Sequence, residues 1–147
     1  MAISEEAEPT PASCQVSLYI KGDALDPDLI SGILAVQPTR AHRMGHAWTT
    51  SGGSGVVEKT GLWRLTLQGD DAEVSALIAV MDRIAMSGET ALASLPGVES
   101  AFVDVLLLTD VDERGGGTGQ LTLDSSAVQI LGRLGLPVEF TFAAVVP

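Results

Sequence analysis

The stretch Gln15-Val16-Ser17-Leu18-Tyr19-Ile20-Lys21 decides the fold, because its apolar residues stand at every second position. This alternation is typical of a strand with one buried face and one solvated face. Residues 62–68 and 138–146 alternate in the same way. Since strands with one polar face need cover on one side only, we expect a sheet whose helices all lie on a single face.

Three helices are predicted between the strands, each marked by residues that suit a helix terminus. An aspartate can accept hydrogen bonds from the free N–H groups at a helix start, proline suits the first turn, and glycine suits the left-handed residue after the end. These signals are, in chain order, Asp26 with Pro27 and Pro38, Asp70 with Glu73 and then Ser87-Gly88, and Asp124 or Ser125 with Gly135. The second helix also has a clear apolar stripe.

Residues 101–109 form an almost unbroken apolar run, interrupted by Asp104, which is typical of a central strand covered on much of both faces. Residues 110–119 are predicted to form a flexible hairpin loop, and residues 120–123 are predicted to form a short strand after it. The element order is then β-α-β-α-β-β-α-β, and its last six elements match the ferredoxin-like βαββαβ unit. We therefore predict an α+β two-layer sandwich of about five strands, with helices on one face and an extra N-terminal strand and helix.

The composition limits the possible classes of protein. A chain of 147 residues with 46% apolar content suits one core, so we expect an acidic, disordered tail over residues 1–13 and a single α+β domain over residues 14–147. A net charge of −11 repels phosphate backbones, which argues against nucleic acid as a partner. The sequence has no signal-peptide pattern and no apolar run of the ~20 residues that a membrane helix needs, so no membrane partner and a cytoplasmic location are expected. Cys14, the single cysteine, is expected to be inert.

Residues 37–60 are the segment most suited to binding, because they show no clear period and carry an unusual charge balance. Four of the eight cationic side chains and both histidines fall within 25 residues, against one acid, Glu58. The cationic residues are Arg40, Arg43, Lys59 and Arg64. A structureless connection of this length is uncommon in a compact domain unless it acts as a lid, a binding loop or an insert.

Five residues are the binding candidates in and beside this loop. Arg40 and Arg43 could form a fork for a carboxylate or phosphate, with His46 and Arg64 as further donors, and Trp48 could serve as an aromatic anchor. The alternative is that the two loop arginines tether the segment to the protein's own excess of acids, which the 19 acidic residues favour.

Several other chemistries can be set aside from residue types and spacing. His42 and His46 are four residues apart but lack a third metal ligand, and we expect exposed loop histidines rather than a metal site. The segment 51–55 lacks the lysine of a phosphate-binding loop and is predicted to be a flexible linker, and no nucleophile elbow follows a strand. We therefore expect no cofactor, no metal and no catalytic residue. Asp104 should pair with a cation such as Arg64 or Lys21, or meet solvent.

The chain also contains short segments that resemble those of a known family. They are Gly22-Asp23-Ala24-Leu25-Asp26-Pro27, Pro38-Thr39, Arg43-Met44-Gly45, Gly61-Leu62-Trp63 and Leu134-Gly135-Leu136-Pro137-Val138. Over roughly residues 15–145 the chain resembles domain-of-unknown-function family 4279, a group of small uncharacterised bacterial proteins. The resemblance implies no established activity, cofactor or catalytic residue. Small bacterial α+β proteins of this kind often neutralise toxins or act as other binding modules, which favours binding over catalysis.

The leading hypothesis is thus a non-catalytic protein-binding module that binds a cationic protein partner through the loop and the adjoining sheet face. The most specific form of this hypothesis is a protein that resembles toxin-immunity proteins. The alternative is a small-molecule anion-binding protein that uses Arg40 and Arg43. Trp63 is expected in the core. If the second face of their strand is exposed, Phe102, Leu106 and Leu108 would form a homodimer patch.

Overall fold

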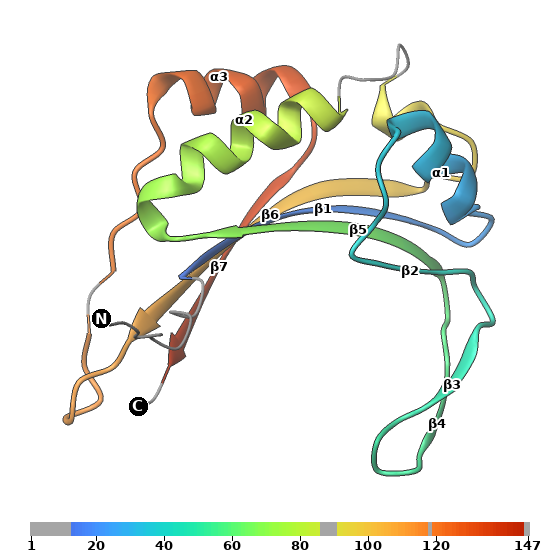
Figure 1. The fold of residues 1–147 in the computed structure, drawn as a ribbon, viewed down its shortest axis with the longest axis horizontal. Helices are drawn as coiled ribbons and strands as arrows, with labels where there is room; N and C mark the ends of the chain where they lie inside the picture. Colours follow the sequence, from blue (N-terminus) through green and yellow to red (C-terminus); the bar gives the residue numbers. More distant parts are fainter. Residues whose placement is uncertain (1–12, 86–90, 118, 146–147) are drawn as a thin grey trace, which may run out of the picture.

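The computed structural model describes residues 13–85, 91–117 and 119–145, which fold into a mixed α+β structure. In chain order the elements are β1 (Cys14–Gly22), α1 (Pro27–Leu34), β2 (Arg40–His42), β3 (Ala47–Thr49), β4 (Gly55–Val57), β5 (Gly61–Gly69), the 3₁₀ turn η1 (Asp71–Glu73), α2 (Val74–Ala85), the 3₁₀ turn η2 (Leu92–Ser94), β6 (Ser100–Asp110), α3 (Ser125–Leu134) and β7 (Val138–Val145). Figure 1 shows α1, α2 and α3 on one side of the main sheet. The predicted α+β class, with five strands in one sheet and helices on one face, is confirmed.

The main sheet has the strand order β2-β5-β1-β6-β7. Strand β1 is antiparallel to both β5 and β6, β2 is antiparallel to β5, and β7 is parallel to β6. The unit β1-α1-β2 therefore spans β5, and the unit β5-α2-β6 spans β1, which is the interlocked split βαβ arrangement of a ferredoxin-like unit. The predicted position of the ferredoxin-like unit in the chain was wrong. The unit includes the first strand and helix, β1 and α1, and the elements added to it are the C-terminal helix α3 and strand β7.

Burial explains why the N-terminal strand is central. Cys14, Val16, Leu18 and Ile20 are all 0% exposed, which requires neighbouring strands on both sides of β1 as well as helices above it. Phe142, on the helix side of β7, is by contrast 64% exposed, as expected for an edge strand. Alternation along a sequence shows that one face of a strand is buried, but it does not show how many neighbours the strand has.

The predicted short strand over residues 120–123 does not form. This segment lies in the connection between β6 and β7, which run parallel, and parallel strands need a crossover rather than a hairpin. Leu121 and Leu123 instead pack from the connection against the edge of the core. The prediction of a hairpin loop followed by a strand was therefore wrong.

The predicted helix starts are confirmed by hydrogen bonds. Asp26 accepts from the N–H groups of the first turn of α1, Asp70 and Glu73 form both bonds of a capping box, and Asp124 accepts at 2.8 Å from the N–H of Ala127. Gly135 ends α3 in the left-handed region with φ 68°. The predicted end of the second helix at residues 87–88 lies outside the described residues, as does the predicted tail apart from Ser13.

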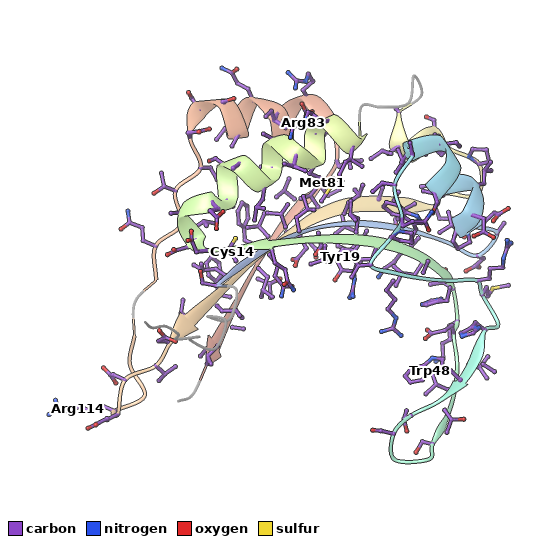
Figure 2. All side chains as sticks on the ribbon, in the orientation of Figure 1. Cys14, Tyr19, Trp48, Met81, Arg83 and Arg114 are labelled. Atoms are coloured by element: carbon purple, nitrogen blue, oxygen red, sulfur yellow. The ribbon has the colours of Figure 1, made fainter. Side chains whose placement is uncertain are left out.

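The core lies between the helices and the sheet. Trp63, predicted to be a core residue, is 0% exposed, and its Nε1 donates a hydrogen bond of 3.0 Å to Ser31 Oγ on α1. Figure 2 shows Met81 directed from α2 toward the sheet. Cys14 is buried, and burial raises the pKa of its thiol. A buried thiol with a raised pKa is a poor nucleophile.

Three glycines bring backbone segments into direct contact at one end of the sheet. A Cβ atom on Gly22 would overlap the carbonyl oxygen of Gly97, and a Cβ on Gly61 would lie 2.5 Å from the carbonyl oxygen of Gly22. Gly97 also has a φ of +78°, a conformation that favours glycine. The three positions hold the turn after β1 against the start of β5 and the turn before β6.

The face of the main sheet opposite the helices, called the open face below, is polar and aromatic. Tyr19 and Phe102 stack with ring centroids 4.8 Å apart, and Lys21 Nζ lies 5.7 and 5.5 Å from the two centroids. Asp104 accepts a hydrogen bond of 2.8 Å from Thr141 Oγ1, and among the described residues no cation lies within ion-pair distance of it. Of the two alternatives predicted for Asp104, the ion pair with Arg64 or Lys21 is not formed, and the residue is partly accessible to solvent.

The residues of the predicted homodimer patch are partly accessible to solvent, and the patch stays a prediction. Phe102, Leu106 and Leu108 do lie on the open face of β6, but each is only partly accessible. Phe102 is covered by its stack with Tyr19. The large exposed phenylalanines are on β7 instead.

Candidate functional site

Residues 43–58 form an arm rather than the structureless loop that the sequence predicts. Strands β3 and β4 pair as a separate two-stranded sheet. The segment 51–55, predicted to be a linker, is mostly the hairpin turn: the N–H of Thr50 bonds the carbonyl of Ser54 at 2.8 Å, and Gly53 has φ +89°. Figure 1 shows the hairpin projecting away from the helical layer. Three-residue strands are too short to show a period in the sequence.

The base of the arm is fixed by Glu58, which accepts hydrogen bonds or ion pairs from three side chains. Trp48 Nε1 donates to Glu58 Oε1 at 2.8 Å, and Arg40 Nη2 lies 3.4 Å from the same oxygen. His42 Nε2 lies 3.5 Å from Glu58 Oε2. The Arg40 guanidinium also lies 5.7 Å from the centroid of the Trp48 ring. Glu58 therefore joins β3 and β4 to β2, which belongs to the main sheet.

The pKa of the Glu58 carboxyl is held below its ordinary value, chiefly by the hydrogen bond from the Trp48 indole. Burial acts in the opposite direction, and the positive charges of His42, Arg40 and His46 lower the pKa further. A carboxylate with a lowered pKa is a weak general base. The cluster is thus suited to holding the arm and less suited to proton transfer.

Acid should weaken the base of the arm. A carboxyl whose pKa is lower in the folded state contributes stability above its unfolded pKa, about 4.3, and loses that contribution as pH falls through the folded value. We expect the difference in unfolding free energy between the wild type and Glu58→Gln to be present at pH 5, where His42 and His46 can add their charge, and to shrink below about pH 4. Urea unfolding at each pH measures it. A difference independent of pH down to pH 3 would contradict the lowered pKa.

Arg43, unlike Arg40, turns away from this cluster. Its Nη2 lies 2.7 Å from Asp26 Oδ1 and 3.8 Å from Asp28 Oδ2, at the start of α1. Asp26 thus caps α1 and pairs with the loop at the same time. Because the two loop arginines pair with different acids of the protein itself, they do not form a common fork.

Arg64 lies on the open face directly opposite Arg40, its partner in the β2–β5 register. Its Nε atom is buried without a hydrogen-bond partner among the described residues, and its guanidinium has no ion pair there. Like charges directly opposite each other on two strands are unfavourable. The pair therefore forms a small positively charged area, extended along β1 by Lys21, on a strongly acidic protein.

A cavity of about 290 Å³ lies at the base of the arm, and a second of about 480 Å³ lies beside it toward α1. The first is lined by Arg40, Ala41, His42, His46, Trp48 and Glu58. Three of the five predicted site residues, Arg40, His46 and Trp48, thus come together. Arg43 and Arg64 lie outside this cavity.

Sequence reasoning missed the central role of Glu58 and misplaced His42. The His42 side chain is only 8% exposed, and its Nδ1 is buried without a partner among the described residues, so it is not an exposed loop histidine. The signal for Glu58 was available, since it is the single acid among the cationic residues of its segment. In the part of the chain that the structure describes, no three His, Cys, Asp or Glu side chains are grouped to hold a metal ion.

Comparison with protein-family models, curated proteins and solved structures gives no match to this chain. The resemblance to family 4279 stays a prediction. None of the helices within the described residues is long and apolar enough to cross a membrane.

Proposed function

We propose that the chain is a non-catalytic protein-binding module that contacts its partner through the β3–β4 hairpin and the adjoining open face. The observation that carries the proposal is the placement of Trp48. Figure 2 shows Trp48 on the projecting arm. The residue is 38% exposed, while its Nε1 donates a hydrogen bond to Glu58. A rigid, partly exposed tryptophan is typical of binding hot spots, because it supplies a large contact area with little loss of side-chain freedom.

Two further apolar residues are exposed on the arm, and the register Ala47↔Val57 places Val57 on the hairpin face opposite Trp48. Val57 is 62% exposed and Met44 is 51% exposed. Arg40 and Arg43, by contrast, are paired with the protein's own acids. The arm thus exposes large apolar side chains on both of its faces. The net charge of the whole chain, −11, would attract a cationic partner, as an immunity protein attracts a cationic toxin.

Variants of the arm test this proposal. Trp48→Ala combined with Val57→Asp should weaken partner binding by about 30-fold or more, the effect of losing a hot spot of ~2 kcal/mol. Val128→Asp is the matched control, because Val128 is 55% exposed but lies on α3, on the helical side. Quantitative capture from an extract of the source cells, repeated at two salt concentrations, measures the effect. Equal capture by all three proteins, or capture that does not weaken as salt rises, would contradict the proposal.

A second candidate, the binding of a small anion, is favoured by the Arg40–Arg64 pair. Two guanidinium groups on neighbouring strands can hold one carboxylate or phosphate, and Arg64 has no internal ion pair among the described residues. This candidate uses Arg64 in place of Arg43, whose Nη2 lies 2.7 Å from Asp26, and Arg40 would share its guanidinium between the anion and Glu58, which lies 3.4 Å away.

A thermal-shift screen with phosphate, succinate and citrate tests the second candidate. An anion at ~100 times its dissociation constant should add about 2.7 kcal/mol of stability to the wild type. Arg64→Gln should remove this gain, whereas Arg43→Gln should retain it. No shift with any of the three anions, or an undiminished shift in Arg64→Gln, would rule this candidate out.

A further inference from the structure

Strand β7 has an unpaired outer edge and exposes three large apolar side chains, beside the polar Glu139 and Thr141. It pairs with β6 on one side, and within the described residues no strand lies on the other side. Phe140 is 46% exposed, Phe142 is 64% exposed and Val145 is 42% exposed. Apolar side chains on a long free edge make a strand prone to pair with another strand.

The backbone groups of the exposed phenylalanines point along this free edge. Toward β6, the N–H of Val103 bonds the carbonyl of Pro137 at 2.9 Å, and the N–H of Val111 bonds the carbonyl of Val145 at 3.3 Å. Backbone groups alternate in direction along a strand, so the odd-numbered residues of β7 face β6. The N–H and C=O groups of Phe140 and Phe142 therefore face outward.

The other edge of the sheet is protected in ways that β7 is not. Strand β2 is three residues long, carries Arg40 and leads directly into the arm. Strand β7 is eight residues long, has no proline or lysine, and contains one charged residue, Glu139. Short length and cationic side chains are common protections against edge-to-edge pairing, and β7 lacks both.

An apolar hollow adjoins the free edge on the helix side of the sheet. Phe140 and Phe142 line a cavity of about 630 Å³ together with Leu121, Leu123 and residues 119–120. The helices do not cover this part of β7. A second strand placed along the edge would bring further side chains over the two phenylalanines.

We propose that β7 pairs with β7 of a second copy of this chain, antiparallel, about a two-fold axis at Thr141, so that the two main sheets become continuous. A strand on a two-fold axis must be complementary to itself. With Thr141 opposite Thr141, each Phe140 lies opposite a Phe142 of the other copy, which gives two aromatic pairs. The same register places Glu139 opposite Ala143, so the one charged residue does not meet its own copy.

Other registers are poorer. An axis at Phe142 would place Phe142 opposite itself and Phe140 opposite Ala144, which leaves one aromatic pair in place of two. Aromatic cross-strand pairs contribute to pairing, and like charges directly opposite oppose it. The strand is thus well matched to itself in the register centred on Thr141.

The size of the contact predicts a weak dimer. The exposed areas of Phe140 and Phe142 add up to about the full surface of one phenylalanine side chain, roughly 200 Å² per copy. With the paired backbone added, the interface should lie near the small end of specific interfaces, at ~1,200 Å² in total, which suits a micromolar dissociation constant. Two copies of charge −11 repel each other, so added salt should strengthen the dimer.

Analytical ultracentrifugation of the full-length chain from about 5 to 500 μM tests the association. The wild type should shift from monomer to dimer across this range, and more completely at high salt. Phe142→Lys should weaken the dimer by about 30-fold or more. Val128→Lys, an exposed site on α3, should behave as the wild type. A wild type that is monomeric throughout, or a dimer that Phe142→Lys leaves unchanged, would overturn the proposal.

A disulfide across the axis tests the register and does not depend on Phe142→Lys being folded. Thr141 would be a non-hydrogen-bonded pair with its own copy, with Cα atoms ~4.5 Å apart, which a disulfide can span. Oxidised glutathione should therefore link Thr141→Cys chains into dimers, two thiols giving one disulfide while the glutathione disulfide is reduced. Glu139→Cys should stay monomeric. Cys14 is buried and adds little background. Equal crosslinking of both variants, or of neither, would overturn the proposal.

Discussion

Replacing Trp63 with alanine is expected to lower the free energy of unfolding by about 3–5 kcal/mol, the usual cost of deleting a large buried ring. Trp63 is fully buried, and the change also removes the hydrogen-bond donor to Ser31 Oγ. Small domains are stable by only about 5–15 kcal/mol, so this variant should be close to unfolding. Urea unfolding followed by far-UV circular dichroism measures the loss.

Trp48→Ala is the matched control, because the chain has two tryptophans and Trp48 lies on the exposed arm. Its loss should cost no more than about 1.5 kcal/mol, mainly through the hydrogen bond to Glu58. Similar losses in the two variants would contradict the division of roles, in which Trp63 stabilises the fold and Trp48 contacts a partner.

Gly22→Ala is expected to cost more than about 3 kcal/mol, although it adds a single methyl group. The added Cβ would overlap the carbonyl oxygen of Gly97, which is backbone and cannot move aside by a rotamer change. The turns after β1 and before β6 would have to separate. Thermal unfolding by calorimetry measures the cost.

Gly32→Ala tests the same substitution in open space. A Cβ on Gly32 has no atom within 4 Å, and the residue lies within α1. Alanine is the better helix former, so this variant should gain about 0.5–1 kcal/mol. If Gly22→Ala were as stable as the wild type while Gly32→Ala gained stability, the close approach at Gly22 would be wrong.

The features that the sequence predicts well are those that depend on near neighbours in the chain. Asp26, Asp70 and Asp124 start helices as predicted, because a cap needs only the N–H groups of the next turn. The buried side of β1 follows from alternation alone, and so does the burial of Trp63. The helices on one face follow from the polar side of the strands.

The features that it predicts poorly depend on residues far apart in the chain. Nothing local shows that β1 has β5 and β6 on its two sides, or that β7 is at the edge. The separation of Arg40 from Arg43 depends on Glu58 and Asp26, which lie on different elements. Spacing in the sequence suggested a fork, but Arg40 on β2 pairs with Glu58, whereas Arg43, which follows β2, pairs with Asp26.

The central position of β1 has a consequence for how the chain folds during synthesis. β1 is made before the other strands within the described residues, yet its two partners are residues 61–69 and 100–110. Sheets that pair distant segments fold slowly, since long loops must close before any contact is gained. The backbone edge of β1 that pairs with β6 therefore stays without a partner in the nascent chain until β6 has emerged, although α1 and α2, which lie over the apolar side of β1, are made earlier.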